Sequence, residues 1–497
     1  MKFPFGRIFG RQHGSYWREQ KKAVEPGSDR TLAKLYRGKY RRNIADLDSE
    51  KRRSIAGHNR RVEAIARSYL KASPRKRTSL DKLANGTKTA ILLAKRRDSI
   101  LLDGFLKNRD RNWRDMATRL RAREHRKLDI RQFSFFENPE GTIRGLRDIA
   151  AAEAECLSGR INFLDEDCLD LGPWLVLAVM RRDMVPVFTG GSIGDQLSAV
   201  IRALGLSTAL RFSLSQTTAS QNEIWAFPLR SRRAAGSSTS PTVHLDPQSK
   251  EEVADELCAA INRWLGHGSG LVLTKDGHRL VLKIVGETLD NAERFSRPEF
   301  PNDGDWSISG YMRRHGDGDT ATFTCQLAFL SVGASINSSV QGCDGPTKAK
   351  MDEYLAAHSH IFPNQMFADD HLRTIFALQD RVSGDPNAIA NGRGGTGFRD
   401  IITLFADLAE ATSQGSNAKL AIVSGRTCLH VASLYCEVSR PRPDQLFNIW
   451  FNRENLKELP PDRGSVVELG EEFRGTLITM LFELDRDYLK NAPDAQH

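Results

Sequence analysis

A carboxylate and a carboxamide lie four residues apart in the segment VLKIVGETLDNAERFS, from Val281 to Ser296. Apolar residues recur at helical spacing here, and on a helix Glu287 and Asn291 lie one turn apart on the same face. Asp290, three residues after Glu287, shares the edge of that face. Such a pair can face one ligand, with the carboxylate as a base toward water and the amide oxygen toward Mg²⁺. The alternative is an amphipathic helix whose polar face merely includes these residues.

A glycine-rich segment, NGRGGTG, begins at Asn391 and is followed by a predicted helix from Phe398 to about Ala411. Glycines before a helix N-terminus let backbone N–H groups approach a polyanion, and the helix dipole favours negative charge there. The segment is not a Walker A loop, because no Lys followed by Ser or Thr comes after the glycines. It therefore predicts a phosphate-binding loop of another kind, the alternative being a flexible turn.

Two further segments flank the glycines. TFTCQLAFLS, ending at Ser331, is a predicted strand that leads into VGASI, and KLAIVS, beginning at Lys419, is another. Near the end of the chain, Gly475 and Thr476 begin a predicted last strand, GTLITMLFEL.

In this order the segments resemble the N-box, first glycine box, phosphate loop and last strand of GHKL ATP-binding domains, found in sensor kinases, type II topoisomerases and mismatch-repair ATPases. The resemblance spans about 200 residues. It implies an α/β (α+β) GHKL, or Bergerat, sandwich that binds ATP and Mg²⁺. By this resemblance, Glu287 activates water and Asn291 holds the metal. The ATP-binding residues that it implies are Asp290, Asn291, Ser331, Gly333, Gly392, Gly394, Gly395, Thr396, Gly397 and Thr476.

One position departs from the family. Where GHKL domains carry an aspartate that binds the adenine amino group, this chain has Ser331, and the second glycine of that box is Ser335. A hydroxyl hydrogen-bonds an amino group without charge, so we expect a weaker contact with adenine.

The middle of the chain alternates strands and helices, which predicts a small α/β domain with a partly parallel sheet. The run INFLDEDCLDLGPWLVLAVMRRDMVPVFTGGSIGDQLSAVIRALGL resembles a STAS domain, the fold of anti-anti-sigma factors. Those domains place a phosphorylatable serine at the start of their first helix here, whereas this chain has Leu171, Gly172 and Pro173. The predicted strands are 161–164, 184–188 and 209–212, and the predicted helices are 172–181 and 193–204.

The charge is concentrated near the N-terminus. About 36 of the Lys and Arg residues lie in the first 130 positions against about 14 Asp and Glu, so this segment carries roughly +22. Apolar residues between the basic clusters, such as Ala90, Ile91 and Leu93, recur at roughly helical spacing. We expect a basic helical arm that binds nucleic acid through its phosphates. The alternatives are a solvated helical surface or a docking face for the acidic remainder of the chain.

The sequence thus predicts three parts. They are a basic helical arm (1–132), a STAS-like α/β domain (133–230) that could dock a protein partner, and a GHKL-type domain (242–490) after a Ser/Gly-rich linker. Scattered cysteines and the lack of a long apolar run predict a cytoplasmic protein that does not cross a membrane. His358, His360 and His371 are interpreted as solvated loop histidines rather than a metal site.

The functional hypothesis is an ATP-dependent switch, with a slow Mg²⁺-dependent ATPase activity, that acts on a nucleic acid or protein partner. Two alternatives remain. One is a scaffold without enzymatic activity, with a degenerate nucleotide site, and the other is a serine kinase resembling anti-sigma kinases.

Overall fold

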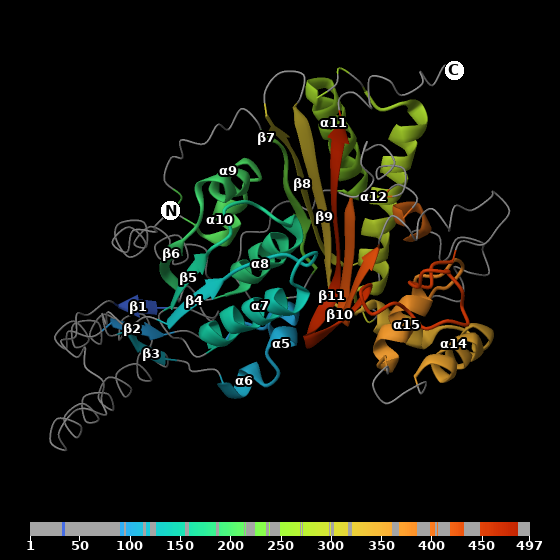
Figure 1. The fold of residues 1–497 in the computed structure, drawn as a ribbon. Coiled ribbons are helices and arrows are strands. Elements are labelled where there is room, and N and C mark those ends of the chain that lie inside the picture. The colour runs from blue at the N-terminus through green and yellow to red at the C-terminus, as the bar shows by residue number, and fades with distance from the viewer. Residues whose placement is uncertain are drawn as a thin grey trace.

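The computed structural model describes most of the chain from residue 96 to residue 485 (Figure 1). The described ranges are 32–34, 90–93, 96–112, 116–119, 126–154, 159–184, 188–212, 214, 224–234, 238, 249–268, 270, 272–297, 299, 303–316, 321–359, 367–384, 398–402, 405, 418–431 and 448–485. The glycine-rich segment and most of the predicted basic arm lie outside these residues.

A five-stranded antiparallel sheet forms the centre of the molecule, in the order β10-β11-β9-β8-β7. The predicted strands that end at Ser331 and begin at Lys419 and Gly475 are confirmed. Antiparallel pairing aligns Trp306, Ser331 and Thr476 in one row across three neighbouring strands. The strands are β7 (Ile224–Arg232), β8 (Asp305–His315), β9 (Thr322–Val332), β10 (Lys419–Val431) and β11 (Val466–Asp485).

Helices cover one face of this sheet (Figure 1). In the longest of them, Thr274 caps the N-terminus by accepting a hydrogen bond from the Gly277 N–H at 3.0 Å, and Val281, Ile284 and Val285 begin its buried stripe. This helix confirms the one predicted from Val281 to Ser296. The helices of this layer are α11 (Lys250–Gly268), α12 (Lys275–Phe295), α13 (Ile336–Ser339), α14 (Gly345–His358) and α15 (Asp369–Ala377).

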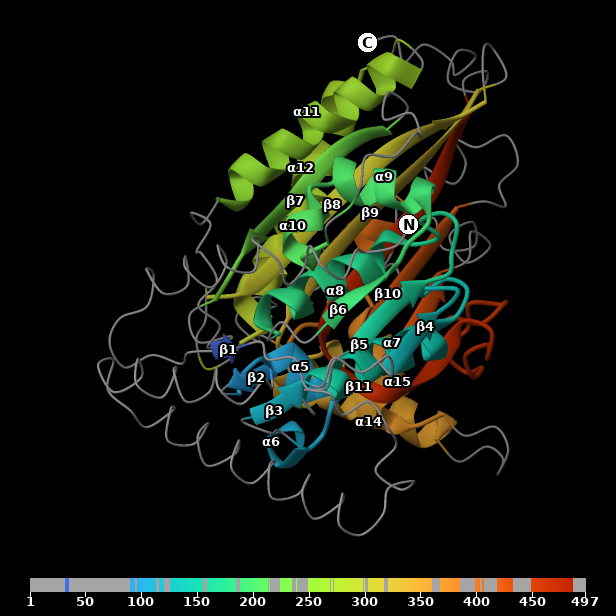
Figure 2. The same ribbon diagram turned by 90° about the vertical axis from the view of Figure 1, so that its left-hand side faces the viewer.

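A small α/β unit covers the other face of the sheet (Figures 1 and 2). Its three strands are parallel in the order β4-β5-β6, which confirms the prediction of a mixed α/β fold with a partly parallel sheet. The elements are β4 (Arg126–Ile130), α7 (Pro139–Ala154), β5 (Gly159–Phe163), α8 (Leu171–Asp183), β6 (Phe188–Ser192), α9 (Asp195–Ala203) and α10 (Leu206–Leu210).

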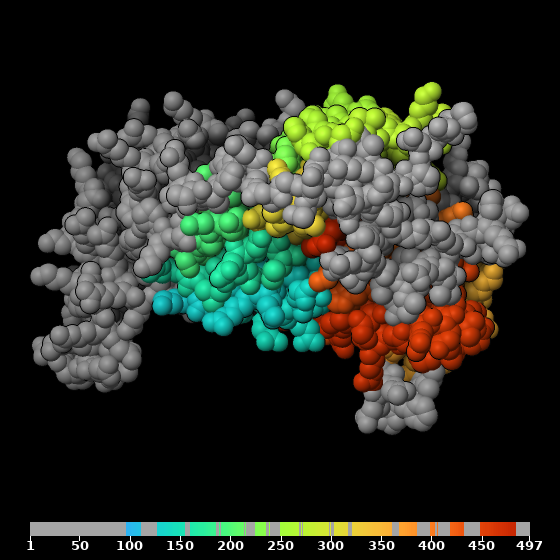
Figure 3. Space-filling model, turned by 45° about the horizontal axis from the view of Figure 1, so that its top comes forward, coloured from blue at the N-terminus to red at the C-terminus, as the bar shows by residue number. Residues whose placement is uncertain are grey.

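Helix α8 is apolar on all sides because it lies between two sheets. Its residues from Leu171 to Met180 are buried, and the tilted rings of Phe163 and Trp174 pack within the unit at 4.4 Å between centroids. Among the described residues, no helix is long and apolar enough to cross a membrane. The space-filling view shows the small α/β unit, in cyan and green, beside the orange-to-red surface of residues near the C-terminus (Figure 3).

The strand predicted at residues 209–212 is wrong. Leu206 and Leu210 are both buried and lie four residues apart, so they form one face of the short helix α10. Arg211 ends that helix in the left-handed conformation, with a φ of 57°. The apolar pair at helical spacing therefore outweighs the short apolar run that suggested a strand.

The predicted helical arm also differs from the structure. Ala90–Leu93 forms strand β2, paired with β1 (Leu32–Lys34) and β3 (Met116–Arg119). Further along, α5 (Ile100–Phe105), together with α6 (Arg109–Asn112), belongs to the body, since Phe105 contacts Phe473 of β11 at 5.9 Å between ring centroids.

An ion pair explains why basic residues enter this interior. The buried Arg109 guanidinium bonds the equally buried Glu153 carboxylate at 2.9 Å. The proximity of Glu153 and Asp103 raises the pKa of Arg109 despite the opposing effect of burial, which is the largest single influence. Because Arg109 is paired in this way, it is not available to a polyanion. The net charge of the segment therefore did not show at which residue the basic arm ends.

Asp170 ties the small α/β unit to the central sheet. One oxygen of its buried carboxylate accepts hydrogen bonds from the Gly172 N–H at 2.8 Å and the Thr479 hydroxyl at 2.6 Å. Its other oxygen accepts one from the Phe135 N–H at 2.7 Å. Burial raises the pKa of Asp170 to about 6, although these three hydrogen bonds oppose the rise. One side chain thus holds the start of α8, the loop after β4 and strand β11 together.

We predict that Asp170→Asn destabilises the protein by about 1–3 kcal/mol at pH 8, where the wild-type carboxylate is ionised. In asparagine an NH₂ group replaces one of the two carboxylate oxygens. This NH₂ group faces a backbone N–H, and two donors cannot bond each other, so one hydrogen bond is lost. Urea denaturation measures the change, with the exposed Asp352→Asn as the matched control. Equal stability of the two variants would contradict this account.

Candidate functional site

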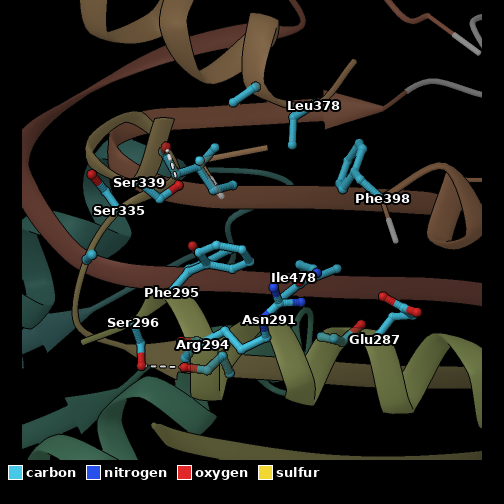
Figure 4. Close-up of a pocket in the computed structure, with 18 of the residues that line it drawn as sticks. Glu287, Asn291, Arg294, Phe295, Ser296, Ser335, Ser339, Leu378, Phe398 and Ile478 are labelled. Carbon is cyan, nitrogen blue, oxygen red and sulfur yellow. Dashed lines mark hydrogen bonds between the residues drawn. The ribbon is translucent and has the colours of Figure 1, made fainter. Parts of the chain in front are cut away.

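A cavity lies between helix α12 and the row of strands β8, β9 and β11 (Figure 4). Helix α13, the segment after α15 and Phe398 complete its wall. Residues separated by almost 200 positions in the sequence, such as Glu287 and Thr476, thus line one space. The cavity is therefore a product of the tertiary fold and not of one local motif.

The α12 wall of the cavity carries the charged groups. Glu287, Asn291 and Arg294 project from α12 into it, and Figure 4 shows Glu287 and Asn291 along the same stretch of the helix. One turn before Glu287, Lys283 forms an ion pair of 2.8 Å with Asp400, which follows the glycine-rich segment. This wall thus has an anionic, a carboxamide and a cationic group within two turns of one helix.

The pKa of Glu287 is raised above its usual range. Burial contributes most, followed by the negative charges of Asp290 and Asp400, while Lys283 and Arg294 oppose the shift. A carboxylate with a raised pKa is a stronger base once ionised, which suits proton abstraction from water.

Hydroxyl groups gather near the row of Trp306, Ser331 and Thr476. The Ser331 and Thr476 side chains line the cavity, and the Thr476 hydroxyl contacts Ser424 of β10 at 3.1 Å. Trp306 donates its indole N–H to the buried Glu293 at 3.0 Å, and this hydrogen bond fixes the ring next to Ser331. This part of the cavity is polar without being charged.

Gly333 closes the wall between these strands and α12. Its φ is 147°, and a β-carbon at this position would lie 2.0 Å from the carbonyl oxygen of Ser296. The same carbonyl accepts a hydrogen bond from the Ala334 N–H at 2.7 Å. The absence of a side chain at Gly333 thus allows the end of α12 to approach the loop after β9.

The structure brings four of the predicted residues into the cavity, namely Glu287, Asn291, Ser331 and Thr476. Gly333 lies next to it and shapes its wall. Asp290 does not line the cavity; its carboxylate pairs with Lys250 of α11 and with Arg294. Gly392, Gly394, Gly395, Thr396 and Gly397 lie outside the described residues, although Phe398, directly after them, lines the cavity.

Sequence reasoning missed several residues of the site. Arg294 could have been found, because it follows Asn291 by three positions and so shares its helix face. Phe295 and Phe398 supply aromatic rings to the wall. Ser424 and Asp400 have no local signal, because only the folded chain brings them to the site.

The histidines predicted to be solvated are buried. His358 is 1% exposed and bonds the Lys457 carbonyl at 2.8 Å, and His371 is 2% exposed and contacts the Thr427 hydroxyl at 2.7 Å. Both lie on apolar helix faces, which explains the error. His360 lies outside the described residues, and within the described ones no cluster of three His, Cys, Asp or Glu residues could hold a metal ion.

Comparisons with protein-family models, curated proteins and solved structures found no match. Any functional assignment therefore rests on the residues of this chain and on their arrangement.

We predict that Gly333→Ala destabilises the protein by at least about 2 kcal/mol, because the new methyl group combines a strained backbone with a clash against Ser296. Thermal or urea denaturation measures the loss. Gly345→Ala is the matched control, since open space surrounds that glycine and its backbone is not left-handed. A Gly333→Ala variant as stable as the Gly345→Ala variant would show that this close approach is not required.

Proposed function

We propose that the cavity binds a nucleoside triphosphate together with Mg²⁺, as the resemblance to GHKL domains implies. The observation that carries this proposal is the convergence of Glu287 and Asn291 with Ser331 and Thr476 in one cavity. The first pair is local in sequence, whereas the second comes from strands that could have packed elsewhere. Their convergence in the expected arrangement favours a nucleotide site over an incidental polar helix face.

The donor groups fit a magnesium–triphosphate complex. The Asn291 amide oxygen is a hard oxygen donor of the kind Mg²⁺ prefers. The buried Thr288 hydroxyl oxygen has no hydrogen-bond partner among the described residues, and Thr288 also lines the cavity. Asn291 would hold the ion, which would neutralise phosphate charge, and Arg294 would contact a phosphate directly.

Glu287 is positioned to orient and deprotonate a water molecule for slow hydrolysis. Its carboxylate lines the cavity one turn from Asn291, and its raised pKa favours accepting a proton. The glycine-rich segment, which ends directly before Phe398, would supply backbone N–H groups to the phosphates.

We further propose that nucleotide binding changes contacts across the sheet. Within β11, Thr476 and Ile478 line the cavity, while Leu477 and Thr479 face the small α/β unit. One strand thus contacts both the proposed ligand and the helix α8. The basic N-terminal segment would then contact nucleic acid through phosphates, as its charge of roughly +22 favours.

A scaffold without catalytic activity is the second candidate, and Ser331 favours it because the family's adenine-binding carboxylate is missing. The STAS-like resemblance of the small α/β unit supports a protein partner. The N-terminus of α8, however, lies under β11, where a β-carbon at Gly172 would be 3.0 Å from Leu477. Phosphorylation at that helix end is therefore no part of the proposal.

The described cysteines are free thiols, which suits the reducing cytoplasm.

We predict that Asn291→Ala weakens Mg-ATP binding by about 10–100-fold while the protein stays folded, because a metal ligand is lost. Calorimetric titrations with and without Mg²⁺ measure the effect. The variant should lose the Mg²⁺ dependence of binding, whereas the remote control Asn162→Ala should keep it. Unchanged affinity and unchanged Mg²⁺ dependence in Asn291→Ala would remove Asn291 from the metal site.

We predict that hydrolysis rises with pH through the raised pKa of Glu287, because the protonated carboxyl cannot accept a proton from water. Asp400→Asn removes a neighbouring negative charge, so it should lower that pKa and move the rise to lower pH. Rates measured between about pH 4 and pH 8 test this, with Asp352→Asn as the control and Glu287→Gln as the inactive reference. A shift to higher pH in Asp400→Asn would contradict the proposed role of Glu287.

A further inference from the structure

The hydrogen bonds around Thr476 determine whether its hydroxyl donates to, or accepts from, a ligand in the cavity. The Ser424 hydroxyl donates its one hydrogen to the Gly475 carbonyl at 2.7 Å and accepts from the Ile336 N–H at 2.9 Å. This 2.7 Å contact is shorter than the 3.1 Å contact between the Ser424 and Thr476 hydroxyls, so we assign the Ser424 hydrogen to Gly475 and make Thr476 the donor to Ser424. With its hydrogen directed at Ser424, Thr476 presents acceptor lone pairs to a ligand.

Ser331 lies beside Thr476 in the antiparallel register and faces the same cavity. Side chains of directly paired residues lie about 5 Å apart at their β-carbons, so both hydroxyls can contact adjacent atoms of one base. The structure gives the Ser331 hydroxyl no hydrogen-bond partner among the described residues. Since a hydroxyl rotates freely, Ser331 can act as a donor or as an acceptor.

The charged side chains among the described residues that line the cavity are Glu287 and Arg294, both on α12. Neither comes from the strand row, so the polar contacts there are neutral. A carboxylate in the place of Ser331 would only accept hydrogen bonds. It would therefore favour an amino group on the base and repel a carbonyl oxygen.

From this arrangement we propose that the site accepts 6-oxo purine nucleoside triphosphates as well as ATP. This inference rests on the proposed nucleotide site and specifies its substrate class. With a 6-amino base, Ser331 accepts from one amino hydrogen and Thr476 accepts from the other. With a 6-oxo base, Ser331 reverses its role and donates to the carbonyl oxygen, while Thr476 accepts from the ring N1–H.

The test is a comparison of Mg-ATP with Mg-ITP on the full chain by competition against a fluorescent nucleotide. Inosine triphosphate differs from ATP in the 6-position and the N1 hydrogen, without the extra 2-amino group of GTP. Wild-type protein should bind the two nucleotides with dissociation constants within about tenfold of each other. Ser331→Asp should raise the preference for ATP over ITP by about 10–100-fold, because the charged acceptor rejects the carbonyl oxygen.

Two variants serve as controls. Ser331→Ala should weaken the binding of both nucleotides by a similar factor, since the hydroxyl contacts both bases. If Ser331→Asp does not fold, this result tests the dual selectivity by itself. Ser339→Asp adds the same charge elsewhere in the cavity wall and should leave the ratio of the two affinities unchanged.

Failure of this inference is distinct from failure of the nucleotide site itself. Wild-type protein that binds Mg-ATP at least about 100-fold more tightly than Mg-ITP would overturn the dual selectivity and leave the site standing. A Ser331→Ala variant that loses affinity for only one nucleotide would also overturn it. Binding of neither nucleotide would overturn both the inference and the proposed function.

Discussion

Burial of the central sheet on both faces is the constraint on which the rest of the structure depends. A sheet covered on both sides carries apolar residues at successive positions, as in the run from Leu477 to Met480 of β11, where Thr479 is the polar exception. Thr479 is tolerated because its hydroxyl bonds Asp170 on the covering α/β unit. Polar side chains on the opposite face collect at the cavity instead.

The same constraint makes the small α/β unit part of one body rather than a separate module. Its helix α8 and the back of the sheet share a single buried core, to which α5 also contributes Leu101, Leu102 and Phe105. A change at the cavity side of β11 therefore meets tightly packed neighbours on the other side. This arrangement gives the proposed switch a physical route between ligand and partner surfaces.

Local patterns in the sequence predicted helix α12 and the strands β9, β10 and β11. They also predicted one pair of site residues, because helical spacing alone places Glu287 and Asn291 on one face. The sequence could not place Asp400, Ser424 or Arg109, whose contacts join segments far apart in the chain. It also misread Ala90–Leu93 and His371, where a short apolar pattern fits more than one environment. In each case the tertiary packing, and not the local sequence, determines the contacts and burial of the residue. The GHKL resemblance, and the nucleotide that it implies, stays a prediction.

The measurement that tests the central claim most directly is a calorimetric titration of the full chain with ATP in the presence and absence of Mg²⁺. A cavity that holds the metal through Asn291 predicts one saturable site per chain, weakened by at least about tenfold when Mg²⁺ is chelated. Binding of equal strength with and without Mg²⁺ would contradict the metal site, and no binding at millimolar ATP would contradict the nucleotide site altogether.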